Sequence, residues 1–196
     1  MKRGGEIQER GFTAVEVVIV LLIVMTIMAM ATIQLQPTIQ QFRANAGMAQ
    51  VKGALRQARE LAISERRSIV VKFIGNNTVQ LFLVNINAGG VQVVAAAPFL
   101  SLPIEGTVTF MTFGGETDTP DGYGFQGPVA FNGIAGGPAV MMFQSDGTFT
   151  DGNGNPINGS VFLGVLGVPT SARAVTVLGA TGRVHTYHAT PTGWTP

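Results

Sequence analysis

One carboxylate lies where a charge is hard to accommodate. Residues 12–33 contain a single charged side chain, that of Glu16, within an otherwise apolar stretch. Burying an unpaired carboxylate in hydrocarbon costs at least about 2.5 kcal/mol on insertion scales. Glu16 therefore needs either a partner of opposite charge or a position from which its side chain reaches water.

A second set of oxygen ligands occurs near the middle of the C-terminal half. Asp151, Asn153 and Asn155 have the alternating oxygen atoms of a calcium-binding loop. However, Pro156 replaces the glycine that such a loop requires, and Phe162 stands where a bidentate acid belongs. The stretch is therefore expected to form an asparagine-glycine turn.

Other chemistry-bearing residues form no recognisable set. His185 and His188 lie three residues apart on an expected strand, so they point to opposite faces and make a poor metal pair. The chain has no cysteine, no nucleophile elbow and no phosphate-binding glycine loop. We expect no enzymatic activity, no metal site and no cofactor.

The charge is unevenly distributed along the 196 residues. Residues 43–72 contain seven bases and two acids, whereas residues 73–196 contain two bases and six acids. The C-terminal part is therefore acidic, which is a poor electrostatic footprint for general nucleic-acid binding.

The apolar stretch is long enough to cross a membrane. As a helix, residues 12–33 extend about 33 Å at ~1.5 Å per residue. Three bases precede this stretch (Lys2, Arg3 and Arg10), and the next base is Arg43. The positive-inside rule places the N-terminus in the cytoplasm and the rest of the chain outside.

Two simpler interpretations of this stretch are open. An ordinary signal anchor explains the hydrophobicity but leaves Glu16 unexplained. A cleavable secretory signal is also compatible with the sequence, because Ala29-Met30-Ala31 has the small-x-small pattern that signal peptidase accepts. Against cleavage there, Glu16 interrupts the early apolar region, and a helical pattern continues past Ala31.

A third interpretation rests on the stretch GFTAVE at residues 11–16, which follows a short charged leader. This stretch resembles the processing motif of type IV pilins and type II secretion pseudopilins. The resemblance implies that a prepilin peptidase cuts between Gly11 and Phe12 and that Phe12 becomes the N-methylated terminus. It also matches Glu16 to the family's glutamate. Ala14 stands where the family usually has leucine.

The physical chemistry of this helix start is consistent with the resemblance. After the cut, Phe12 carries a positive amine, and Glu16 lies one helical turn away. Glu16 can then pair with the amine of a neighbouring subunit, so both charges are compensated only when helices pack in register. The alternative is that Glu16 lies at the cytoplasmic interface and extends its carboxylate to water.

The chain continues beyond the apolar stretch as an amphipathic helix. Apolar residues recur at alternating spacings of four and three. They are Ala44, Met48, Val51, Leu55, Ala58 and Ala62. We expect one long helix that bends near Pro37 and is weakened slightly by Gly47 and Gly53. The basic residues on its other faces are expected to be solvated or to face other subunits.

Residues 51–73 and 172–188 narrow the resemblance to the GspH/FimT family of minor pseudopilins and minor pilins. The first stretch follows the family's helix-to-strand passage, with Leu55, Ala58, Arg59, Ala62, Arg66 and Arg67 at the matching places. The second resembles the family's terminal hairpin, which commonly ends in glycine-arginine-x-arginine. This chain has Gly182 and Arg183, but His185 replaces the second arginine.

From residue 68 the pattern changes to β-branched runs separated by glycine, asparagine and proline. The expected strands are 68–74, 78–85, 91–97, 106–113, 129–132, 139–144, 160–166, 173–178 and 183–188. Short strands at this spacing favour an antiparallel sandwich. The glycine-rich residues 114–128 are expected to be a mobile loop. The pattern therefore predicts an α+β fold with a long N-terminal helix packed on an antiparallel β-sandwich, and the resemblance implies that this fold is pilin-like.

The expected organisation has four parts. Residues 1–11 form the prepilin leader peptide, and residues 12–33 form the transmembrane and assembly helix. Residues 34–66 form the amphipathic stem helix. Residues 67–196 form the GspH-like β-sandwich domain.

The resemblance implies a minor pseudopilin of a type II secretion system or a type IV pilus-like filament. Its partners would be other pilins or pseudopilins, the prepilin peptidase and an inner-membrane assembly platform. It would cross the bacterial inner membrane once, with the C-terminal domain in the periplasm. Some FimT-like members bind DNA through the terminal arginine pair, here Arg183 and His185. Nucleic acid is nevertheless disfavoured as a partner, and a membrane-anchored periplasmic enzyme is a remote third hypothesis.

Overall fold

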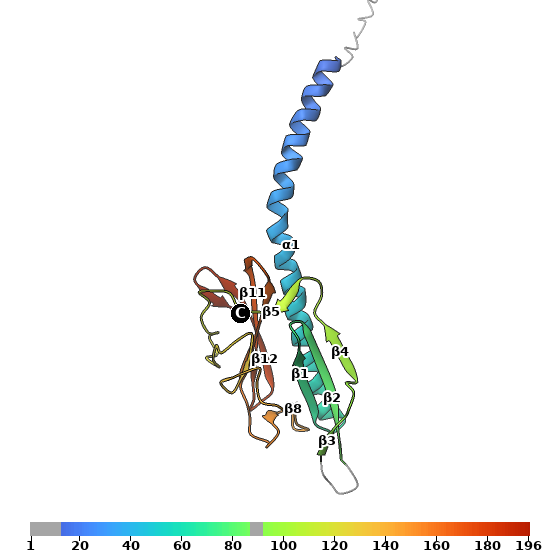
Figure 1. Cartoon of the computed structure of the whole chain (residues 1–196), viewed down its shortest axis with the longest axis vertical. Helices are drawn as coiled ribbons and strands as arrows, with labels where there is room; N and C mark the ends of the chain where they lie inside the picture. The colour runs from blue at the N-terminus through green and yellow to red at the C-terminus, as the bar shows by residue number, and fades with distance from the viewer. Residues whose placement is uncertain (1–12, 87–91) are drawn as a thin grey trace, which may run out of the picture. The chain divides into compact units, whose positions relative to one another are not determined.

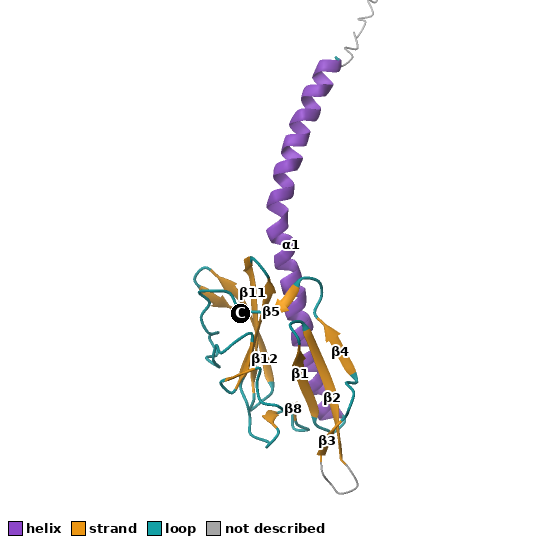
Figure 2. Cartoon of the chain, in the orientation of Figure 1, coloured by secondary structure: helices purple, strands orange, loops and turns teal. Residues whose placement is uncertain are grey.

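The computed structural model describes residues 13–86 and 92–196, which contain one helix and thirteen strands. The chain forms two compact units, residues 1–38 and residues 39–196. Figures 1 and 2 show the helix and the strands along the chain. The helix α1 (Ala14–Ser64) contributes to both units.

The helix α1 starts at a side-chain cap and continues without interruption for 51 residues. The Glu16 backbone N–H donates to the Thr13 hydroxyl at 3.3 Å, which makes Thr13 the N-cap of the helix. Pro37 lies inside α1 and does not end it. The expectation of a single long helix is therefore confirmed.

The first part of α1 is long and apolar enough to cross a membrane. Its large apolar side chains from Val15 to Met30 are 39% to 68% exposed within the chain. Among the described residues, no other element covers this apolar surface.

The part of α1 in the second unit buries the apolar stripe that the spacing predicts. All six expected residues are at most 8% exposed: Ala44, Met48, Val51, Leu55, Ala58 and Ala62. Five of them, all except Ala44, belong to one core cluster that also contains residues from strands of both sheets. The amphipathic pattern is thereby confirmed.

The first sheet is antiparallel and has six strands. They are β1 (Ile69–Ile74), β2 (Thr78–Ile86), β3 (Gln92–Val94), β4 (Leu100–Pro103), β8 (Met141–Phe143) and β9 (Phe149–Asp151). Their order is β3-β2-β1-β8-β9, and β4 also pairs with β2. The turn between β1 and β2 connects Ile74 to its partner Thr78, as the two asparagines there predict.

The second sheet is also antiparallel and has seven strands. They are β5 (Val108–Phe110), β6 (Val129–Phe131), β7 (Ile134–Ala135), β10 (Gly159–Val165), β11 (Val168–Leu178), β12 (Arg183–Thr190) and β13 (Gly193–Thr195). Their order is β13-β12-β11-β10-β6-β7, and β5 also pairs with β10. The expected fold, a long helix packed on antiparallel sheets, is confirmed.

Polar contacts attach α1 to the second sheet in addition to the apolar core. Arg173 on β11 is 5% exposed, and its Nε donates to Asn45 Oδ1 of α1 at 2.6 Å. Its Nη1 donates to the carbonyl oxygens of Thr170 and Ala172. Burial lowers the pKa of the Arg173 guanidinium. These bonds satisfy a buried cation that no carboxylate accompanies among the described residues.

Each of the nine expected strands corresponds to an observed strand, but several boundaries differ. Residues 91–97 and 106–113 shorten to β3 and β5. Four strands were missed: β4, β7, β9 and β13. These four are short, and glycine or proline beside or within each of them indicates a turn in the sequence.

Residues 114–128 contain no strand, as expected, and a side-chain hydrogen bond attaches them to the second sheet; their mobility stays a prediction. The Asp118 carboxylate accepts from the Thr119 and Gly124 backbone N–H groups. Asp121 accepts from the Thr176 hydroxyl of β11.

The two glycines inside α1 differ in their surroundings, which gives a test of the packing. A Cβ on Gly47 would lie 2.8 Å from Ile104 Cγ2 and 2.9 Å from Val108 Cγ1, both buried β-branched residues. A Cβ on Gly53 would meet nothing within 4 Å. We expect Gly47→Ala to destabilise the second unit by about 1–3 kcal/mol through overpacking.

Gly53→Ala is the matched control and should stabilise by about 0.5–1 kcal/mol, because only the helix propensity changes. Denaturant unfolding of the full chain in detergent, followed by Trp194 fluorescence, measures both. Equal effects of the two substitutions would contradict the close packing of α1 at Gly47.

Candidate functional site

The start of α1 contains the candidate assembly residue. The Glu16 side chain is exposed, and its carboxylate has no hydrogen bond or ion pair within the described part of the chain. Only its backbone N–H is used, by the Thr13 cap. The expected cleavage site at Gly11 and Phe12, and the expected methylation of Phe12, lie outside the described residues.

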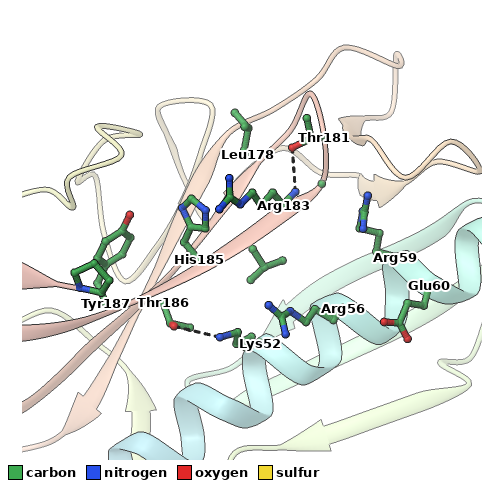
Figure 3. Close-up of a pocket in the computed structure, with 13 residues that line it drawn as sticks. Lys52, Arg56, Arg59, Glu60, Leu178, Thr181, Arg183, His185, Thr186 and Tyr187 are labelled. Carbon is green, nitrogen blue, oxygen red and sulfur yellow. Dashed lines mark hydrogen bonds between the residues drawn. The ribbon is translucent and has the colours of Figure 1, made fainter.

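A cavity of about 920 Å³ lies between α1 and β12 (Figure 3). On one wall, Lys52, Arg56 and Arg59 share a helix face because they are spaced by four and three residues. On the other wall, Arg183 extends from the start of β12. We call this cavity with its four cations (Lys52, Arg56, Arg59 and Arg183) the cationic groove.

Two of the four cations are tied to the fold. The Lys52 ammonium donates to the Thr186 hydroxyl of β12 at 3.4 Å across the groove. Arg59 Nε donates to the Gly147 carbonyl oxygen at 3.2 Å and so attaches the β8–β9 turn to the helix. These contacts place the helix face and the strand at a defined separation.

The other two cations, Arg56 and Arg183, are available to bind a ligand. Arg56 and Arg183 are exposed, and no partner is found for either guanidinium within residues 13–86 and 92–196. Most of β12 is half-buried, and Arg183 at its start is exposed.

His185 is less available than the sequence suggests. Its Nδ1 lies 3.3 Å from Asp121 Oδ2, and its Nε2 is buried without a partner. The same Asp121 carboxylate, together with burial, raises the pKa of the Tyr187 phenol. Arg183 and His185 thus lie side by side on β12 (Figure 3). His185 is engaged by Asp121 of the 114–128 loop.

The groove is suited to binding an anionic group. Its lining contains four cations and one acid, Glu60. The sequence placed Arg183 in a candidate site but assigned Lys52 and Arg56 to a general basic surface. The spacing of Lys52 and Arg56 in the sequence indicates that they share a helix face. Only the tertiary structure shows that this face lies opposite β12.

A second cavity, of about 400 Å³, lies beside the 114–128 loop. Phe113, Glu116 and Trp194 contribute to its lining, and Trp194 Nε1 donates to the Thr117 carbonyl oxygen at 2.8 Å. Glu116 Oε2 accepts from the Phe113 N–H at 2.8 Å, whereas Oε1 is buried without a partner. Burial raises the pKa of the Glu116 carboxyl above its ordinary value.

The expected turn at Asp151 is stabilised by hydrogen bonds among its own residues. Asp151 Oδ1 accepts from the backbone N–H groups of Asn153 and Asn155, and Oδ2 accepts from the Asn155 side-chain amide. These bonds lower the pKa of the Asp151 carboxyl. Among the described residues, no group of three or more histidine, aspartate or glutamate side chains is placed to hold a metal ion.

The raised pKa of Glu116 predicts a pH-dependent stability. A carboxyl that holds its proton more tightly in the folded state contributes stability below its ordinary pKa of 4.5, and this contribution is lost as the pH rises through the folded pKa. We therefore expect Glu116→Gln to raise the Tm more at pH 7 than at pH 4. Thermal unfolding of the full chain in detergent at both pH values measures this difference.

Asp146 is the control, because its pKa is shifted in the opposite direction. Hydrogen bonds from the Thr148 hydroxyl and N–H lower the pKa of Asp146. Its contribution to folding stability is therefore present above its ordinary pKa of 3.8 and is lost as the pH falls. Asp146→Asn should lower the Tm at pH 7 and have little effect at the acidic end. A Glu116→Gln difference that is the same at pH 4 and pH 7 would show that Glu116 is not desolvated.

Known proteins resemble the chain only in fold. No family model matches it, and no curated protein does. Among solved structures, the type IV minor pilin FimU of Pseudomonas aeruginosa is 15% identical, with 82% of this chain and 96% of that chain covered and a TM-score of 0.45. The minor pseudopilin EpsH of the Type 2 Secretion System of Vibrio cholerae is 13% identical, with coverages of 74% and 97% and a TM-score of 0.44. These similarities assign no activity to this chain.

Proposed function

We propose that the chain is a minor pilin-like or pseudopilin-like subunit that assembles into a filament through the start of α1. The observation that carries this proposal is Glu16: a carboxylate in an apolar, exposed helix, without a partner for its side chain in the described part of the chain. The motif at residues 11–16 supports the same interpretation.

The proposed assembly contact is an ion pair between subunits. Cleavage after Gly11 creates a positive amine on Phe12, and Glu16 of a neighbouring subunit supplies the negative charge. A buried carboxylate and a buried amine each cost several kcal/mol when unpaired, so the pair selects one register between neighbouring helices. The Thr13 cap holds the helix start, and the positive end of the helix dipole favours the Glu16 carboxylate.

The division of α1 supports this role. The stripe from Ala44 to Ala62 is buried by the chain's own strands, whereas the apolar residues from Val15 to Met30 are not. A surface of this kind needs lipid or other apolar helices to cover it. We propose that lipid covers it before assembly and that neighbouring subunits cover it in the filament.

The proposal has further parts that follow from the resemblance of the sequence. The prepilin peptidase would process the chain and methylate Phe12, and an inner-membrane assembly platform would extract it. The chain would cross the bacterial inner membrane once, with residues 67–196 in the periplasm. We favour a type II secretion pseudopilus slightly over a type IV pilus. We propose a mechanical role and not an enzymatic one.

DNA binding is the second candidate function, and one observation favours it. The cationic groove adds Lys52, Arg56 and Arg59 to Arg183. Two observations oppose it: residues 73–196 carry six acids against two bases, and His185 is engaged by Asp121. Four cations also provide few phosphate contacts for useful affinity at physiological salt.

The proposed processing predicts a defined mature terminus. The protein purified from a host with a prepilin peptidase should begin at N-methyl-Phe12, as measured by intact mass and N-terminal peptide mass spectrometry. A host without the peptidase should give a chain that retains residues 1–11. A mature chain beginning at Thr32 would instead establish cleavage by signal peptidase after Ala31.

The proposed ion pair predicts that loss of the Glu16 charge prevents filament assembly but leaves membrane insertion unchanged. Glu16→Val and Glu16→Gln should both insert normally into the membrane, because neither adds charge to the apolar helix, yet both should fail to enter filaments. Glu65→Gln, which removes an exposed carboxylate in the second unit, is the control and should assemble normally.

Membrane fractionation measures insertion, and immunoblots of sheared filaments measure assembly. Glu16→Gln keeps the shape of the side chain, so its failure would identify the charge as the cause. Normal filament incorporation of Glu16→Gln would rule out the proposed pairing.

A further inference from the structure

β12 (Arg183–Thr190) is paired over most of its length on one side and over only three residues on the other. β11 pairs with residues 183–188, whereas β13 on the opposite side pairs with residues 188–190. Among the described residues, no strand pairs with residues 183–187 on the β13 side. The same residues of β12 line the cationic groove. The groove therefore contains a free strand edge.

The long strands β2 and β10 are covered more completely than β12. Two short strands share one edge of β2, with β4 at residues 78–81 and β3 at residues 84–86. Two short strands likewise share one edge of β10, with β6 at residues 159–161 and β5 at residues 163–165. β12 has one such short strand, β13, and its remaining half faces the cavity.

The backbone groups at this edge have a defined direction. Thr190 and Gly193 flank the two-residue turn between β12 and β13, where flanking residues exchange the closing backbone hydrogen bonds. Backbone groups alternate sides along a strand, so every second residue back from Thr190 faces the same way. Val184 and Thr186 therefore present their N–H and C=O groups to the free side of β12.

The space and the charge of the groove indicate what could pair there. Residues 183–187 span about 17 Å at ~3.4 Å per residue, and the cavity beside them measures about 920 Å³. Arg56 and Arg183, both without partners in the described part of the chain, lie on opposite walls (Figure 3). An extended segment in this position would pass between them.

We infer that the groove binds an extended acidic segment of a partner polypeptide, which adds a strand to β12 at residues 183–187. The strand edge supplies backbone donors and acceptors, and the four cations select carboxylates. Lys52 would exchange the Thr186 hydroxyl for a carboxylate, because a charge-assisted hydrogen bond is stronger than a neutral one.

The strand edge favours a polypeptide over a nucleic acid. A phosphate backbone accepts hydrogen bonds but offers no repeating amide donors, so it would leave the C=O groups of Val184 and Thr186 without partners. A second strand satisfies both kinds of group at once. The groove lies wholly within residues 39–196. The inference therefore does not depend on the filament contact proposed for Glu16.

The test uses the full chain in detergent and a fluorescent nonapeptide of alternating glutamate and valine, which places all carboxylates on one face of a strand. Fluorescence anisotropy should show saturable binding that a nonapeptide of alternating lysine and valine lacks. The double variant Arg56→Ala/Arg183→Ala should weaken binding tenfold or more. Neither guanidinium has a hydrogen bond or ion pair among the described residues, so the Tm should change little.

Backbone pairing between β12 and the peptide is tested by altering first the protein and then the peptide. Thr186→Pro removes the edge N–H, and Thr186→Val removes only the hydroxyl; Pro should weaken binding at least tenfold more than Val. If Thr186→Pro does not fold, pairing is tested through the peptide instead. Two further peptides are made, one N-methylated at its odd-numbered residues and the other at its even-numbered residues. At least one methylated peptide should lose tenfold or more in affinity.

Three results would overturn the inference. In the first, both methylated peptides bind the unaltered protein as well as the parent peptide does. In the second, the double arginine variant keeps full affinity for the acidic peptide. In the third, a single-stranded oligonucleotide binds more tightly than the peptide and displaces it from the groove, which would assign the groove to nucleic acid.

Discussion

The fold depends on a single amphipathic helix that must bury one stripe of small and branched side chains. Between Ala44 and Ala62, α1 packs into a core that both sheets share. Among the described residues no strand of one sheet pairs with a strand of the other. The common core holds the sheets together, with backbone hydrogen bonds such as that from the Phe149 N–H to the Gly179 carbonyl oxygen. Small residues such as Ala44, Ala58 and Gly47 allow close approach, and the 2.8 Å spacing at Gly47 shows that no methyl group is accommodated there.

This constraint also positions the charged residues. Once the stripe faces the core, Lys52, Arg56 and Arg59 must lie on the adjacent face, which the register of α1 places beside β12. Arg59 and Lys52 then form hydrogen bonds to Gly147 and Thr186, which add polar contacts at the boundary of the core. The cationic groove is therefore a consequence of how the helix packs, and no special loop builds it.

The two parts of α1 have different surroundings. Its first part carries an apolar surface that the chain leaves uncovered, with one carboxylate at the start. Its second part is a structural element of the globular unit. A subunit built this way can assemble through one end of the helix while the other end presents a folded domain with its own binding groove. The two proposed contacts use different residues and different chemistry.

The sequence alone determined the long helix, its buried stripe, the nine principal strands and the unusual position of Glu16, because these features are set by local periodicity and by residue types. The short strands β4, β7, β9 and β13 could not be predicted, because glycine or proline beside or within each of them indicates a turn in the sequence. Only the tertiary structure showed that Arg56 and Arg183 flank one groove, that Asp121 engages His185, and that half of β12 has a free edge. Each of these facts depends on segments far apart in the chain, whose approach is decided by the packing of the whole core.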